Sequence, residues 1–362
     1  MLTPNSQVCQ FPSTATQSEE QAAAERYVSE AAKAREAGNY AKALKKLQKG
    51  RAVLQQWGLE SSLLCMHMGQ VQAYYGEWTE AEAELKRGLD YQLSTSPDSE
   101  LAVQLSTSLV ELYHQRDLLE ETVEQGLWIL RTFAGSEHVF EKLRALYFLA
   151  EACYRLDEEA KGLALLEQWT EQLADSGPSQ CVLFCTQAER LRLMKKDWAA
   201  AQLYERALEA LPAGYLAAYA KHMLANCYQQ QGRNQRARTA YSEALHTHIA
   251  HYPQSQATFR LFVDIDLAAQ AISDTKPPFA NLVQVYSAHF PQSLGLACCL
   301  SHLAQTHYRL YRKEKAEKFF IQAKALFSAH FPATLEYADC LCKYAATQKT
   351  EEDEEFARVK AL

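Results

Sequence analysis

Three histidines close together are the first residues that could carry chemistry. His246, His248 and His251 lie within six positions of one another. His248 and His251 are three apart and would share one face of a helix, as the ligands of a metal ion must. A metal site would need further ligands at matching spacing. The alternatives are a metal site and packing at a helix end, and we expect packing, with no metal bound.

The cysteines are the second candidate group. The chain has ten, none in a Cys-x-x-Cys pair. Cys181 and Cys185 stand one helical turn apart, and Cys340 and Cys342 lie on opposite faces of a helix. Free cysteine in an apolar helix packs as a small hydrophobic residue. We therefore expect interior packing rather than a redox or zinc role, and a reducing compartment without disulfides.

Catalytic signatures are missing from the sequence. It contains no Gly-x-Ser-x-Gly, phosphate-binding loop, dinucleotide fingerprint or His-Glu-x-x-His. Paired acids such as Glu120 and Glu121 stand at expected helix starts, where they favour the helix dipole. We predict that the protein is not an enzyme and needs no cofactor.

A repeated phrase shows how the chain is organised. His251-Tyr252-Pro253-Gln254-Ser255 returns as His289-Phe290-Pro291-Gln292-Ser293 and as His330-Phe331-Pro332-Ala333-Thr334. A period of about 40 residues indicates a helical-repeat solenoid. Proline stops one helix, and the serine or threonine two positions later can cap the next. The aromatic residue is expected to pack over the junction between repeats.

Apolar periodicity and short turns divide the chain into helical pairs. Turns are expected near Gly76, Asp117, Asp157, Lys195, Gly232 and Tyr311, with a degenerate seventh pair turning near 276–278. A lone helix at about 333–347 would cover the last repeat. The expected pairs span 21–57, 61–94, 99–134, 137–175, 179–211, 214–250, 255–289 and 293–329.

Composition limits the partners. The 362 residues carry a net charge of −7, without the basic stripe of a nucleic-acid binder, and contain no apolar stretch long enough to span a membrane. No secretory signal is evident. Residues 1–20 are expected to form a disordered arm. The repeats then occupy 21–347, and 348–362 form an acidic tail around Glu351–Glu355.

The small and large residues within the pairs resemble a tetratricopeptide repeat (TPR). The fifth pair matches best, with Ala188, Ala200, Tyr204, Ala207 and Pro212. Small residues let the helix backbones approach, and a large residue fills the space between them. The resemblance implies an all-α, right-handed α-solenoid of about eight TPR-like hairpins plus a C-terminal capping helix. The longer period and the His-Pro junction are similar to the kinesin light chain and related adaptors.

In that family the first helix of each pair lines the concave groove. Asn226 stands where clamp-type members hold a peptide, but His222 replaces their lysine, which disfavours a chaperone-tail clamp. Carrying the register over residue by residue implies a partner-binding groove formed by Arg144, Tyr147, Glu151, Tyr154, Glu189, Arg192, Tyr219, His222, Asn226, Gln229, Ser301, Gln305 and Tyr308.

The functional hypothesis is a non-enzymatic adaptor or scaffold. It would bind a peptide or helix of a partner protein in the concave groove, since Tyr, Arg, Asn and Gln provide contact area and hydrogen bonds. The alternatives are a structural subunit that binds through its edges within a multiprotein complex, and a peptide-responsive regulatory sensor. We expect no nucleic acid partner, and the cytoplasm as compartment, with the nucleus as the alternative.

Overall fold

The computed structural model describes residues 14–36, 39–56, 58–135, 138–173, 180–211, 214–271 and 279–361. These residues form α-helices joined by short turns, with no β-strand among them. The part of the expected arm that precedes residue 14, and the expected turn at 276–278, lie outside the described residues. The all-α helical-repeat fold predicted from the sequence is confirmed.

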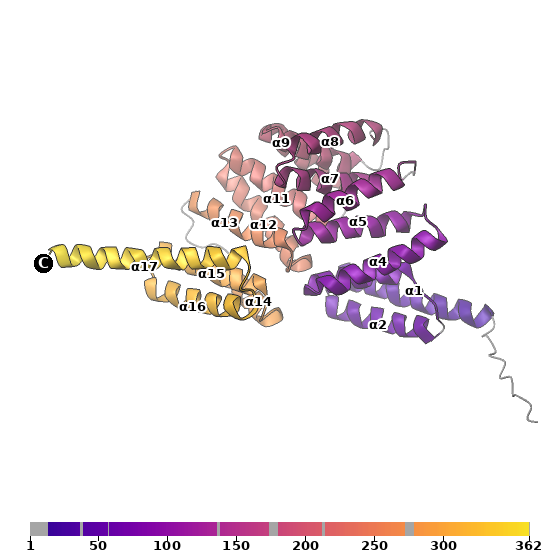
Figure 1. Ribbon diagram of the computed structural model, residues 1–362, viewed down its shortest axis with the longest axis horizontal. Coiled ribbons are helices and arrows are strands. Elements are labelled where there is room, and N and C mark those ends of the chain that lie inside the picture. Colours follow the sequence, from indigo (N-terminus) through magenta and orange to yellow (C-terminus); the bar gives the residue numbers. More distant parts are fainter. Residues whose placement is uncertain are drawn as a thin grey trace, which may run out of the picture.

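The helices form consecutive pairs that follow a curved path (Figure 1). The first four pairs are α1 (Thr14–Glu36) and α2 (Tyr40–Gln56), α3 (Ser62–Tyr75) and α4 (Trp78–Thr95), α5 (Glu100–Gln115) and α6 (Leu119–Thr132), α7 (Val139–Arg155) and α8 (Glu159–Leu173). The next four are α9 (Gln180–Leu193) and α10 (Asp197–Ala210), α11 (Tyr215–Gln230) and α12 (Asn234–His251), α13 (Gln256–Ala271) and α14 (Phe279–His289), α15 (Leu294–Arg309) and α16 (Lys313–His330).

Six turns inside the pairs share one backbone conformation. Each places a residue at positive φ after the first helix, which is the left-handed conformation that ends many helices. Glycine adopts this conformation without steric cost, whereas the four other residues are held in it by the packing of the helices on either side. The residues are those expected from the sequence: Gly76, Asp117, Asp157, Lys195, Gly232 and Tyr311.

Small residues permit the close crossing within pairs. Ala200 and Ala207 on α10 are fully buried, and the Tyr204 ring between them is also fully buried. In the third pair Thr122 replaces the expected alanine, and its hydroxyl donates to the Leu118 carbonyl at 2.6 Å. A threonine therefore still permits the two helices of this pair to cross closely, because its hydroxyl forms a hydrogen bond within its own helix.

The repeated phrase forms helix junctions as predicted. Ser255, Ser293 and Thr334 accept hydrogen bonds from backbone N–H groups three residues later, at 3.3, 3.1 and 3.3 Å. The Tyr252 ring packs edge-on against Tyr215, with ring centroids 5.0 Å apart. The capping role of Ser293 and Thr334 and the junction role of the aromatic residue are confirmed.

The seventh pair departs from the regular hairpin. Helix α14 packs closely on α15, where the Tyr286 ring lies over Gly295. It meets α13 through large rings, with the Phe262 centroid 6.1 Å from that of Phe279. Phenylalanine and tyrosine stand here where a regular crossing has small residues, so α13 and α14 stay further apart.

The last helix, α17 (Leu335–Ala361), covers the open face of the eighth pair. Tyr337 stacks on Phe327 at 5.4 Å, and Cys340 is fully buried. The helix runs past the expected end near 347, through residues expected to form an acidic tail. Glutamate, alanine, lysine and arginine there have high helix propensity. With α15 and α16, α17 extends to one side (Figure 1).

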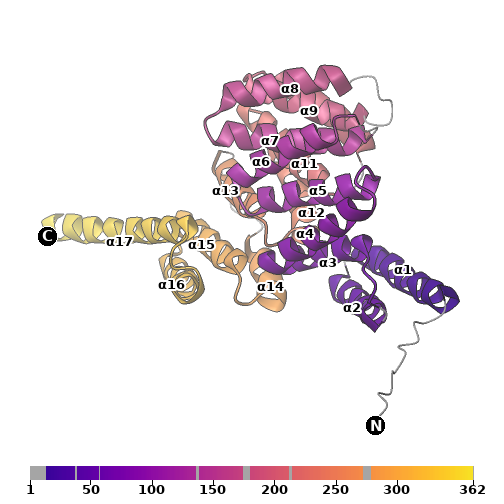
Figure 2. The same ribbon diagram turned by 45° about the vertical axis from the view of Figure 1, so that its right-hand side comes forward.

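The N-terminal and C-terminal repeats touch each other. We call this contact the seam: the ends of α2, α3 and α5 face the α12–α13 and α14–α15 junctions. Across it, the Tyr40 hydroxyl lies 3.0 Å from His251 Nδ1, and the Tyr74 and Phe290 rings lie 5.7 Å apart. In Figure 2, α14 lies beside the ends of α3 and α4. The repeat path is therefore nearly closed on itself.

Candidate functional site

The residues expected in the concave groove lie on the first helices of their pairs. Six of the thirteen are buried and the other seven are partly exposed. Tyr147 and Glu189 are fully buried, and Glu151, Tyr219, His222 and Ser301 are 2–3% exposed. In this structure their side chains contact other parts of the chain, and their assignment to a partner-binding surface stays a prediction.

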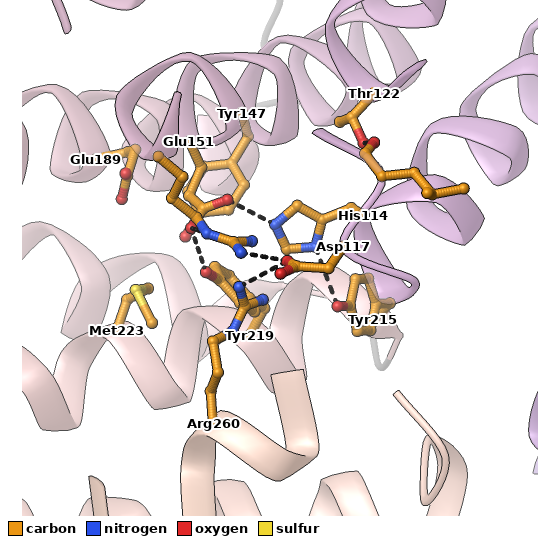
Figure 3. Close-up of polar contacts among 12 residues, drawn as sticks. His114, Asp117, Thr122, Tyr147, Glu151, Glu189, Tyr215, Tyr219, Met223 and Arg260 are labelled. Carbon is orange, nitrogen blue, oxygen red and sulfur yellow. Dashed lines mark hydrogen bonds and ion pairs between the residues drawn. The ribbon is translucent and has the colours of Figure 1, made fainter. Parts of the chain in front are cut away.

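A group of side chains at the centre, which we call the inner polar cluster, explains this burial. Six of its members are labelled in Figure 3: His114, Asp117, Glu151, Tyr215, Tyr219 and Arg260. Arg155, which pairs with Asp117, is the seventh. They come from α5, α7, α11 and α13 and from the turn after α5. The cluster joins the inner faces of helices that are two and three repeats apart.

Glu151 is the centre of the inner polar cluster. Its carboxylate accepts from the Tyr219 hydroxyl at 2.7 Å and lies 2.8 Å from His114 Nε2. A carboxylate only accepts, so Nε2 carries the hydrogen, and in the neutral ring Nδ1 accepts from the Tyr215 hydroxyl, 3.0 Å away. The arrangement satisfies both ring nitrogens and both carboxylate oxygens.

Burial and neighbouring charges set the ionisation of this pair. Burial raises the pKa of the Glu151 carboxyl, but His114, Arg260 and Arg155 outweigh it and bring the pKa well below its usual range. Burial lowers the pKa of His114 despite the carboxylate beside it. We conclude that Glu151 is ionised and His114 is neutral. The positive charges of Arg155 and Arg260 balance the negative charges of Glu151 and Asp117.

The other predicted residues on α7 and α9 form ion pairs and ring contacts. Arg144 pairs with Glu111 and Glu141, and Arg192 donates to Glu189. The Tyr204 hydroxyl also donates to Glu189, at 2.7 Å, and lies 3.2 Å from the Tyr147 hydroxyl. Tyr154 accepts from Lys195 at 2.9 Å and lies under the Arg192 guanidinium.

The predicted residues on α11 and α15 divide into two groups. The Tyr241 hydroxyl of the same pair donates to Asn226 Oδ1 at 2.6 Å and also contacts the side-chain amide of Gln229. His222 Nε2 lies 2.6 Å from an Asp264 oxygen on α13. The second group lies on α15, in the C-terminal hairpin and away from the inner polar cluster (Figure 1), and consists of Ser301, Gln305 and Tyr308.

An open part of the inner surface lies near the N-terminal pairs. We call it the inner cavity, with a volume of about 350 Å³. The inner faces of α1, α3, α5 and α7 form one wall, and the ends of α11 and α12 form the other. Its lining includes Arg35, Tyr40, Tyr74, Glu111, Arg144, Tyr215, Thr247 and Tyr252.

Of these lining residues, the sequence had singled out Arg144 as a groove residue and Tyr252 as part of the repeated phrase. Tyr40 and Tyr74 stack face to face with centroids 3.6 Å apart. Arg35 contributes a guanidinium with no ion pair in the described part of the chain. The repeated phrase is the sequence feature that points to this region, because it marks the helix junction that contains Tyr252. The sequence does not show which distant helices that junction contacts.

The histidines and cysteines act as packing residues in this structure. His248 Nδ1 lies 3.1 Å from the Thr258 hydroxyl, and His251 contacts Tyr40. Cys181, Cys185 and Cys340 are buried and unpaired, and Cys342 is exposed. Within the described residues, no group of three or more His, Cys, Asp or Glu side chains is arranged to hold a metal ion.

Comparisons with known proteins bear on the fold. No family model and no curated protein matches the sequence. The solved structure of a human IFIT1 dimer with PPP-AAAA aligns with 90% of this chain and 74% of its own, at 13% identity and a TM-score of 0.55. The apo quorum sensor NprR from B. thuringiensis aligns with 86% and 91%, at 12% identity and a TM-score of 0.50. The fold is TPR-like.

A third match is BtubC (BKLC) from P. vanneervenii. It covers 61% of this chain and 91% of that protein, at 18% identity and a TM-score of 0.44. The likeness to IFIT1 and NprR shows similarity of fold, not of function. No helix in the described part of the chain is both long and apolar enough to cross a membrane.

Proposed function

We propose that this protein is a non-enzymatic interaction adaptor that binds a peptide segment of a partner protein in the inner cavity. The main support for this proposal is the inner cavity, because its volume of about 350 Å³ lies within the range of ligand-binding pockets. Its Tyr40–Tyr74 stack offers apolar contact area, and Arg35 offers donor N–H groups that form no ion pair in the described part of the chain. Aromatic rings and arginine are the side chains that contribute most at protein interfaces.

The charges of the inner surface favour a peptide over a polyanion. IFIT1 was solved with PPP-AAAA, so a nucleic acid is the natural competing ligand. Phosphate recognition needs free cations. Here Arg144, Arg155, Arg192 and Arg260 each pair with a carboxylate of this chain, which leaves Arg35 as the single unpaired arginine of the described inner surface. We therefore assign no nucleic acid partner, and we place the protein, with its unpaired cysteines, in the cytoplasm.

Exposed apolar side chains support a second candidate, a structural subunit that binds through its edges. On α13, Val263 and Leu267 are one helical turn apart and 44% and 49% exposed. Leu335 at the start of α17 is 86% exposed. Exposed apolar residues that lie together mark interaction surfaces.

Affinity capture with quantitative mass spectrometry distinguishes the two candidates. A Thr247→Trp variant fills the inner cavity, and a Val263→Ser variant alters the edge, while both leave the inner polar cluster intact. Partners lost with Thr247→Trp and retained with Val263→Ser support the inner cavity. The opposite pattern refutes it and supports the structural subunit.

A further inference from the structure

A second, larger cavity lies on the seam. We call it the seam cavity, with a volume of about 650 Å³. It is bounded by the C-terminal ends of α3 and α5, the start of α4, the start of α13 and the α14–α15 junction. In Figure 2 this is the region where α14 approaches α3 and α4. Only Gln115 lines both this cavity and the inner cavity.

Aromatic rings form much of the wall of the seam cavity. Trp78 and Tyr75 come from the N-terminal side, and Phe259, Phe290 and Phe331 come from the C-terminal side. Phe259 is buried, whereas the other four rings are partly exposed. Phe290 is held between Tyr74 and Tyr286, at centroid distances of 5.7 and 5.8 Å. The rings are therefore fixed in place with part of their surface free.

Amide side chains supply the polar part of the lining. Gln115, Gln254, Gln256 and Gln292 all face this cavity. The buried Gln254 Nε2 has no hydrogen-bond acceptor within the described chain. The partly exposed side chain of Trp78 adds a second donor, its indole N–H, to the lining. Unsatisfied buried donors are uncommon in folded proteins, and a ligand that brings acceptors would satisfy them.

The lining carries little free charge. Its one charged side chain among the described lining residues is Arg116, which donates to Glu82 at 2.6 Å. An ionic ligand would find no unpaired partner in this cavity, and burying its charge would be costly. A neutral ligand with carbonyl acceptors and compact apolar rings matches what the walls offer.

We propose that the seam cavity binds an uncharged, proline-rich peptide segment in the polyproline II conformation. Proline rings pack on aromatic side chains in the grooves that recognise such segments. Polyproline II leaves its backbone carbonyls free of internal hydrogen bonds, so they can accept from glutamine amides and the indole N–H. The segment is already extended before binding, which lowers the entropy cost. This site is additional to the inner cavity.

Two substitutions test the amide contacts without disturbing the fold. Gln292→Glu and Gln256→Glu keep the side-chain length but replace a donor with an acceptor-only carboxylate. Gln292 is exposed. Gln256 is the first residue of α13, after the cap Ser255, where an acidic residue is favoured by the helix dipole. The variants are therefore expected to fold as the wild type does.

The probe is fluorescein-labelled decaproline, measured by anisotropy against the full chain. We expect saturable binding to the wild type, at least about tenfold weaker binding to the Gln256→Glu, Gln292→Glu double variant, and unchanged binding to Arg35→Gln in the inner cavity. A labelled Gly-Ser decamer is expected not to bind. Trp78→Phe, which keeps a ring but removes the N–H, should weaken binding by a smaller factor.

Several results would overturn the proposal. These are no saturable decaproline binding at millimolar protein, equal binding of the Gly-Ser decamer, or equal decaproline affinity in the wild type and the double variant. Loss of binding in Arg35→Gln with retention in the double variant would move the peptide to the inner cavity. That outcome also refutes the seam site, while leaving the proposed adaptor function standing.

Discussion

His114 on α5 and Tyr215 on α11 are 101 positions apart in the chain, and their side chains meet at 3.0 Å between Nδ1 and the hydroxyl. The two helices belong to the third and sixth pairs, so the repeat path turns tightly enough for inner faces three repeats apart to touch. As a result, the central part of the expected groove is filled by the protein's own side chains. In the described part of the chain, the inner cavity is an open part of the inner surface.

The inner polar cluster should contribute strongly to stability. In Glu151→Gln the amide cannot accept from both Tyr219 and His114, and it no longer balances Arg155 and Arg260. We expect the free energy of unfolding to fall by about 1–3 kcal/mol, measured by urea denaturation. Glu124→Gln, at an exposed site on α6, should change it by less than about 0.5 kcal/mol. Equal effects of the two substitutions would contradict this role.

Acid should destabilise the protein through a buried histidine. Burial, followed by the neighbouring His222, lowers the pKa of His248 to about 3. Below about pH 6.5 the unfolded chain binds a proton that the folded ring does not, so stability falls with pH down to about 3. One such proton costs about 1.4 kcal/mol per pH unit.

The measurement compares urea denaturation of the wild type and His248→Gln at pH 6.5 and 4.5. Between these pH values the wild type should lose about 2–3 kcal/mol more than the variant, because the variant lacks this titration. The same pH-dependent loss in both proteins would show that His248 is not coupled to folding.

Contact across the seam should stabilise the N-terminal repeats. Tyr74→Ala removes the stack on Tyr40 and the contact with Phe290. We expect amide hydrogen exchange in α2 and α3 to become faster by a factor of about 10 or more, which corresponds to about 1.4 kcal/mol of lost local stability. Exchange in α16 serves as the internal control. If α16 changes as much as α3, the effect is global and the seam is not a separate contact.

Close packing of α14 on α15 depends on a glycine. A Cβ atom at Gly295 would lie 2.2 Å from Tyr286 Cε1, closer than any real contact. Gly295→Ala should therefore lower the free energy of unfolding by about 1–3 kcal/mol. Gly135→Ala, where a Cβ meets nothing within 4 Å, is the matched control and should change it by less than about 0.5 kcal/mol. A neutral Gly295→Ala would contradict the observed position of α14.

The sequence predicts the elements well because helices and turns depend on neighbouring residues. The turns at Gly76, Asp117 and Tyr311 and the caps Ser293 and Thr334 follow from local residue types, and they are found where expected. The curvature of the repeat path is a sum of small rotations between pairs, which no single residue encodes. The contact of His114 with Tyr215 depends on that sum.

The partner-binding role of the residues named from the sequence stays a prediction. As the expected register requires, Tyr147, Glu151 and Tyr219 lie on the first helices of their pairs. Whether such a side chain faces an open groove or another helix depends on the superhelical pitch of the repeats. Arg35, Tyr40 and Tyr74 line the inner cavity because α12 approaches them, and no local pattern in the sequence indicates that approach. The repeated phrase was interpreted as a junction motif, and its contacts across the seam involve residues about 200 positions away.

Photo-crosslinking from the inner cavity tests the central claim most directly. A benzophenone amino acid is placed at Thr247 in one protein and at Leu267, on the exposed edge of α13, in another. The account predicts that partner proteins cross-link from position 247 and not from 267, and that the cross-linked peptide is one short segment. Cross-linking from position 267 alone would contradict it.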